Sequence, residues 1–140
     1  MIQNLPNVVK LKGTENLTEI DIALTKAFRS LNPSAAAPKR ACVEIVSDVL
    51  LQHHAVITRK WLSVVIQDLK LRGFVTLAVV NPQMHPSEEA HAILGLFDGE
   101  IGIEEKEIAG GTMRILKIKR LIGKKYLEDQ FELSKDKLGH

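Results

Sequence analysis

The feature that most restricts how this chain can fold is an apolar run without alternation, residues 74–80, in which only Thr76 is polar. A strand with one face in water alternates apolar and polar side chains, whereas a strand covered on both faces is apolar throughout. Gly73 precedes the run and is well placed to end a helix in the left-handed conformation. Residues 74–80 therefore predict a central strand of a parallel sheet that is covered on both faces.

The chain before residue 40 predicts one strand and one helix. Residues 8–12 read as a short strand, and Asn16 with Glu19 makes a capping pair for the helix that follows. Apolar side chains then recur at helical spacing up to Leu31, and Asn32–Pro33 is expected to stop the helix.

The next segment predicts a second strand and a second helix. Residues 41–47 read as the strand, which is apolar apart from Glu44 until it reaches Ser47. Residues 54–71 repeat apolar side chains at helical spacing, with Trp61 on the inner face, and predict the helix.

The last third of the chain changes from helical to extended periodicity. A third helix is expected from Pro86 to about Asp98–Gly99. Residues 100–108 and 113–121 then read as an antiparallel pair joined by a turn at 109–112, and residues 126–133 are compatible with one more short strand.

The order β-α-β-α-β-α-β-β predicts an α/β fold, because alternating units of this kind build layered sheets through right-handed crossovers. We expect a three-layer α/β sandwich with a mainly parallel sheet and a C-terminal antiparallel hairpin. A length of 140 residues fits a single domain over residues 1–140.

Charge and cysteine content restrict the setting. A formal net charge of +2 is too small to argue for nucleic acid as a partner. No apolar stretch reaches the ~18 residues of a membrane span, and no signal peptide is visible. The one cysteine, Cys42, fits a reducing compartment and is expected to be a buried structural thiol. These features favour a cytoplasmic protein without membrane contact.

Polar residues follow both predicted parallel strands, where ligands bind in open α/β sheets. They are Ser47, Asp48, Asn81, Gln83 and His85. Glu44, within the earlier strand, has two readings of equal weight: a carboxylate at a sheet edge, or a vestigial metal ligand. His53 and His54 are adjacent and cannot share one helix face, which argues against a metal site there.

Four segments, in this order, resemble KaiC-like members of the RecA superfamily. Residues 40–51 resemble the Walker B strand and the turn after it, and residues 76–81 resemble the next core strand. Residues 96–101 resemble the Asp-Gly end of a helix, and residues 114–123 resemble a strand with a basic pair near its end. The similarity extends over residues 8–133.

This resemblance implies residue roles that spacing alone does not give. Glu44 matches the acidic residue that serves magnesium, with Asp48 as a second candidate beside Ser47. Asn81 matches the polar residue that senses the terminal phosphate. Arg120 matches a basic residue that reaches the nucleotide of a neighbouring subunit in ring-forming relatives.

The departures from the family bear on activity. The chain has no Gly-x-x-x-x-Gly-Lys-Ser/Thr loop, whose backbone amides and lysine hold a triphosphate. Ile122 stands where the second basic residue of the family would be. We therefore expect no autonomous ATP hydrolysis, no catalytic residue and no resident cofactor or metal, with weak binding of Mg-ATP left open.

Three functions compete on these observations. The first is a non-catalytic, regulatory or protein-interaction module that forms a homo-oligomer or binds another protein. Its predicted contacts are Val8, Val9, Leu11, Ile45 and Val46. The second is the C-terminal part of an ATPase whose phosphate loop lies elsewhere. The third is a winged-helix DNA binder with residues 58–71 as recognition helix, against which the predicted strand 41–47 argues.

The basic run 114–125 alternates with Ile and Leu, which is typical of an amphipathic strand but would also suit a phosphate, nucleic-acid or acidic-partner surface.

Overall fold

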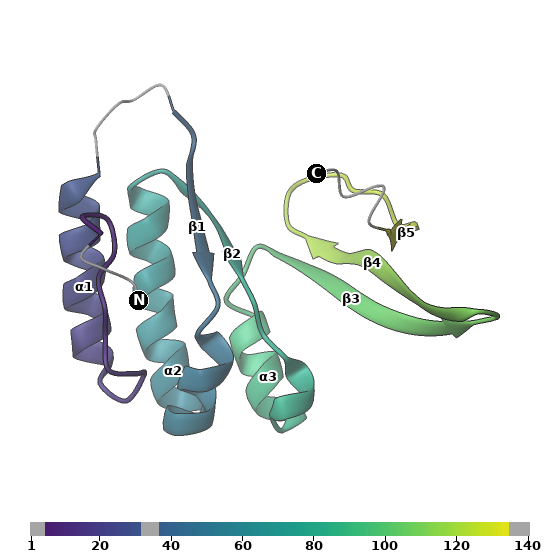
Figure 1. Ribbon diagram of the computed structural model, residues 1–140, viewed down its shortest axis with the longest axis horizontal. Helices are drawn as coiled ribbons and strands as arrows, with labels where there is room; N and C mark the ends of the chain where they lie inside the picture. The colour runs from purple at the N-terminus through teal and green to yellow at the C-terminus, as the bar shows by residue number, and fades with distance from the viewer. Residues whose placement is uncertain (1–4, 32–36, 135–140) are drawn as a thin grey trace. The chain divides into compact units, whose positions relative to one another are not determined.

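The computed structural model of the chain describes residues 5–31 and 37–134. Its elements are α1 (Leu17–Ser30), β1 (Lys39–Val43), α2 (Val46–Leu71), β2 (Phe74–Ala78), the 3-10 turn η1 (Pro82–Met84), α3 (Ser87–Leu94), β3 (Gly99–Ile108), β4 (Gly111–Leu121) and β5 (Gln130–Leu133) (Figure 1). The predicted mixed α/β class is confirmed.

Residue contacts divide the chain into two compact units, one up to Ile93 and the other from Leu94 onward. The first contains a two-stranded parallel sheet, β1–β2, and the second a three-stranded antiparallel sheet in the order β3-β4-β5. The single domain over residues 1–140 stays a prediction. None of the helices that the structure describes has both the length and the apolar character needed to cross a membrane.

The parallel pairing of β2 was correctly predicted, but its burial on both faces was not. Each residue of β1 pairs with one of β2, from Lys39 with Phe74 to Val43 with Ala78. Side chains on one face of β2 are half-buried, whereas on the other face Val75 is 74% exposed and Leu77 58% exposed. The strand is apolar apart from Thr76, yet only one of its faces is covered in the first unit.

The helix α2 begins earlier than the sequence predicted. The strand expected over residues 41–47 ends at Val43, and Ile45 is the N-cap of a helix that starts at Val46. The reason is that Val46, Val49 and Leu50, spaced three and four apart, are all fully buried as one face of the helix.

Within α2 the helix is broken at His54, which has φ 59° and ψ 178°. Beyond the break, the fully buried Thr58 donates its hydroxyl hydrogen to the carbonyl oxygen of Val49 at 3.3 Å. This bond spans the interruption of the helical ladder. The part of α2 after the break matches the helix predicted over residues 54–71.

The first helix confirms its predicted cap, while the strand predicted before it is wrong. The Asn16 side chain accepts hydrogen bonds from the backbone N–H groups of Thr18 and Glu19. Residues 8–12 are irregular, and Val8, Val9 and Leu11 are exposed. The two β-branched valines suit a strand, but no described residue pairs with this segment in a sheet. The stop predicted at Asn32–Pro33 lies outside the described residues.

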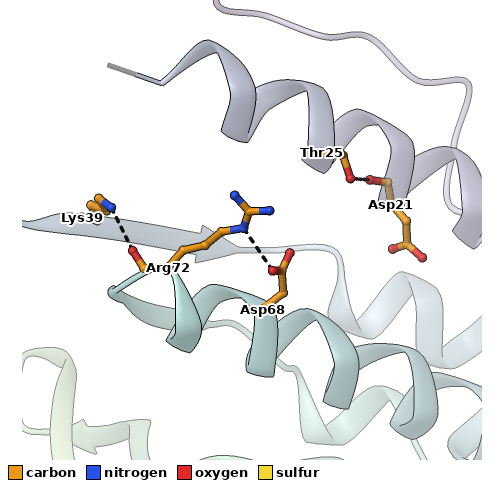
Figure 2. A network of polar contacts seen from close by, with 5 residues as sticks. All are labelled: Asp21, Thr25, Lys39, Asp68 and Arg72. Atoms are coloured by element: carbon orange, nitrogen blue, oxygen red, sulfur yellow. Dashed lines mark hydrogen bonds and ion pairs between the residues drawn. The ribbon is translucent and has the colours of Figure 1, made fainter. Parts of the chain in front are cut away.

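Polar contacts tie the start of β1 to the end of α2 (Figure 2). Lys39 Nζ donates to the carbonyl oxygen of Arg72 at 2.9 Å, and Arg72 Nε donates to Asp68 Oδ1 at 3.0 Å. The Arg72 guanidinium also lies 4.3 Å from the centre of the Phe28 ring of α1. Gly73, with φ +83°, then reverses the chain into β2, as predicted.

The predicted hairpin is confirmed in the second unit. Ile108 pairs with Gly111, so the connecting loop is Ala109–Gly110. Gly110 in the loop and Gly111 at the start of β4 both have positive φ, which glycine adopts readily. The short last strand, β5, pairs antiparallel with β4.

Candidate functional site

A buried serine joins the ends of the two parallel strands. Ser47, the second residue of α2, is only 9% exposed. Its hydroxyl oxygen accepts the backbone N–H of Asn81 at 3.0 Å, and it lies 3.0 Å from Nε2 of His85. The backbone N–H of Val79 donates to the carbonyl of Val43 just before this point, at 2.9 Å. The structure thus brings Ser47, Asn81 and His85 together at the carboxyl ends of β1 and β2.

The turn after β2 positions the other two members of this cluster. Asn81 caps η1 by accepting the backbone N–H of Gln83 at 3.1 Å on its side-chain oxygen. The turn that follows carries the half-buried His85 back to Ser47. Ser47 and Asn81 were both predicted as site residues. His85 was predicted only as a polar residue after the strand. The signal that could have placed it is Asn81 followed by Pro82, a cap and a first helical residue that start a short turn.

The chemistry of the Ser47–His85 pair is that of a hydroxyl within reach of a base. When His85 carries its proton on Nδ1, Ser47 can accept from Asn81 and donate its own hydrogen to Nε2. A nucleophilic serine also needs an orienting group on the base and an anion-stabilising pocket. Among the described residues, no carboxylate bonds the second nitrogen of the His85 ring. Through its contacts with Asn81 and His85, Ser47 forms a clamp that fastens the turn after β2 to the start of α2.

The two predicted acidic residues remain at the surface. Glu44 follows β1 and is exposed, and Asp48 is exposed in the first turn of α2. Asp48 lies in a shallow cleft with Lys12 and Thr14. Nowhere in the described part of the chain do three His, Cys, Asp or Glu side chains gather as a metal site requires.

Neighbouring His53 and His54 have separate partners. His53 Nε2 lies 3.0 Å from the carbonyl oxygen of Thr14, and His54 Nδ1 lies 3.4 Å from Glu89 Oε1.

Arg120, the fifth predicted site residue, is engaged within the second unit. Its two terminal nitrogens donate to the carbonyl oxygens of Leu94 and Phe97, both at 3.0 Å. These carbonyls end α3 and the turn after it, where helices leave backbone acceptors without partners. Arg120 therefore stabilises the end of a helix.

Cys42 is exposed, which contradicts the buried thiol expected from the sequence. It lies on β1 opposite Leu77 of β2, on the face of the sheet that is left uncovered. The cause is the same as for β2, since both strands present one face to solvent.

An apolar groove of about 360 Å³ separates α1 from β1 and α2. The side chains of α1 that line it include Leu24 and Phe28, and those of α2 are Trp61, Val65 and Leu69. The Trp61 indole N–H donates to Asp21 Oδ1 at 2.8 Å and joins the two helices across it.

Comparison with known proteins does not assign this site. The chain matches no protein-family model, and no curated protein matches it either.

Proposed function

We propose that the chain is a non-catalytic interaction module similar to the later half of a RecA/KaiC-type ATPase core. It associates with a second copy of itself through the outer face of the β1–β2 sheet, defined as Arg40, Cys42, Val75, Leu77 and Val79. The finer three-layer, RecA-like architecture belongs to this proposal.

One observation carries the proposal: a row of exposed apolar side chains on the parallel strand β2 and the residue just after it. Val75, Leu77 and Val79 are 74%, 58% and 49% exposed. Parallel sheets are almost always covered on both faces, and a contiguous apolar patch on a protein surface is typical of an interaction site. The sheet also has an unpaired edge along β2 among the described residues, which can accept a further strand.

Charge placement favours a second copy as the partner. Arg40 lies near the amino end of the outer face, and Glu44, two residues beyond Cys42, lies at its carboxyl end. A twofold axis that stacks two such faces in opposite directions would set each Arg40 near the partner's Glu44. Closed twofold dimers are the commonest soluble homo-oligomers.

The contact residues predicted from the sequence do not belong to the outer face proposed here. Val46 is fully buried in α2, and Ile45 is half-buried at the start of that helix. Val8, Val9 and Leu11 are exposed, but they are irregular and do not belong to the sheet.

The proposal is tested by light scattering at micromolar concentration on the whole chain and on two variants. Leu77→Lys places a charge in the middle of the outer face, and Val56→Lys places the same charge on α2, where Val56 is 84% exposed. We expect a dimer for the unchanged protein and for Val56→Lys, and a monomer for Leu77→Lys. Circular dichroism establishes that both variants keep their helices. A monomeric unchanged protein, or a Leu77→Lys variant that stays dimeric, contradicts the proposal.

A further inference from the structure

The apolar groove between α1, α2 and β1 lies beside β1, where a further strand of the sheet would pair. Ala41, Cys42 and Val43 of β1 line it, followed by Glu44 and Ile45 just beyond the strand, together with Phe74 of β2. Successive side chains of a strand point to opposite faces of a sheet. Because Cys42 points to the outer face and still borders the groove, the groove follows the backbone of β1 beside the inward-facing Ala41 and Val43.

That edge of β1 is open to pairing. β1 is bonded to β2 on one side, and among the described residues no strand lies on its other side. An open edge presents unpaired backbone N–H and C=O groups. The helices α1 and α2 supply apolar walls to the groove, so a strand entering it would gain backbone pairing and apolar burial together.

A segment of this chain is anchored where such a strand would have to end. The carbonyl of Thr14 is held by His53 at 3.0 Å. Residues Lys12 to Glu15 line a shallow cleft together with Asp48, Leu51 and Gln52 of α2. This cleft lies just beyond the carboxyl end of β1, because α2 begins three residues after Val43. Residues 8–12 therefore lead toward the same end as β1, which is the direction of a parallel neighbour.

We propose that residues 8–12 are a strap that closes onto the edge of β1 as a third parallel strand. In the structure the strap is open and irregular, with Val9 53% and Leu11 43% exposed (purple in Figure 1). Closure fills the groove and pairs the edge. Opening offers the edge to a second strand. This device acts on β1 and does not depend on the proposed contact through the outer face of the sheet.

The hydrophobic pattern fixes which side chains of the closed strap face the groove, and the complementary charges of Lys12 and Glu44 select one register among those shifted by two residues. Val9 and Leu11 must face the groove, beside the half-buried Ala41 and Val43. Lys10 then lies opposite Cys42 on the outer side. In the same register Lys12 lies opposite Glu44, so the two charges are complementary.

The register is tested with the native cysteine, which is the only one in the chain. In Lys10→Cys the new thiol would lie opposite Cys42, and neighbouring strands are ~4.8 Å apart, within the Cα–Cα range of a disulfide. In the matched variant Val9→Cys the new thiol would point to the opposite face. Oxidised glutathione accepts the two thiol hydrogens, and mass spectrometry with a non-reducing gel identifies the product.

We expect an intramolecular disulfide in nearly all of the Lys10→Cys chains and in few of the Val9→Cys chains. Crosslinks only between two chains would overturn the proposal, because the strap would then serve a second copy. No crosslink in either variant, or equal crosslinking in both, would also overturn it. Circular dichroism of the reduced variants, compared with the unchanged protein, establishes that both are folded.

Discussion

At the scale of single residues, Ser47 fastens the two parallel strands at their carboxyl ends. Removing its hydroxyl in Ser47→Ala leaves the Asn81 N–H and the His85 ring without their partner. An unsatisfied group in such a position costs about 1–3 kcal/mol. We expect the free energy of unfolding in urea to fall by about that much.

Ser30→Ala is the control for this prediction. Ser30 also donates a hydrogen bond, to the carbonyl of Ala27 at 2.8 Å, but it is exposed at the end of α1. Loss of a surface bond of this kind changes stability by less than about 0.5 kcal/mol. Equal effects of the two substitutions would show that the Ser47 cluster is solvated and does not act as a clamp.

Part of this cluster was readable from the sequence. The rule that ligands and polar residues gather beyond the carboxyl ends of parallel strands identified Ser47 and Asn81. The pairing of Ser47 with His85 was not predicted, because it depends on α2 starting at Val46 and turning Ser47 inward. The exposure of Cys42 was also missed, since the sequence does not say which face of β1 is uncovered.

At the scale of elements, the break in α2 concentrates backbone strain at His54. Its φ of 59° and ψ of 178° fall in a region that is essentially restricted to glycine and costs other residues about 1–3 kcal/mol. The His54 side chain is 76% exposed and lies 3.4 Å from Glu89, so little burial is lost on substitution. We expect His54→Gly to raise the free energy of unfolding by about 1 kcal/mol.

A glycine two residues earlier separates strain from general flexibility. Gln52 is exposed in the regular part of α2, where glycine costs about 1 kcal/mol. Thermal unfolding should therefore move in opposite directions for Gln52→Gly and His54→Gly. If His54→Gly also lowers the midpoint, the positive φ at this position carries no strain.

Elements with strong local signals were predicted, and those decided by distant contacts were not. Asn16 fixes the start of α1 through its own cap, and Gly110 and Gly111 fix the hairpin turn. In contrast, the apolar β-branched residues at 8–12 and 45–46 suit a strand or a buried helix equally well. Packing decided for a helix at Val46 and for irregular chain at residues 8–12.

At the scale of the whole molecule, we expect the chain to bind no Mg-ATP at micromolar concentration. No sequence in it supplies the backbone cradle and lysine that hold a triphosphate. Arg120, which the sequence resemblance predicted to reach a nucleotide, already donates to two backbone carbonyls. Calorimetry should give flat titrations for the unchanged protein and for Glu44→Ala. A micromolar dissociation constant that is abolished by Glu44→Ala would instead establish a working nucleotide site.

The pairing of β1 with β2 across the whole of α2 has a consequence for the order of folding. The hairpin of β3 and β4 joins residues that are close along the chain, and hairpins form in about 1–10 μs. Lys39 can pair with Phe74 only after the long loop of chain between them has closed. Because closing that loop costs conformational entropy, parallel pairing is slow. Until then the apolar residues of β2 are exposed on a nascent chain. A cell that makes this protein therefore faces its greatest risk of aggregation in the interval between synthesis of residue 78 and closure of the crossover.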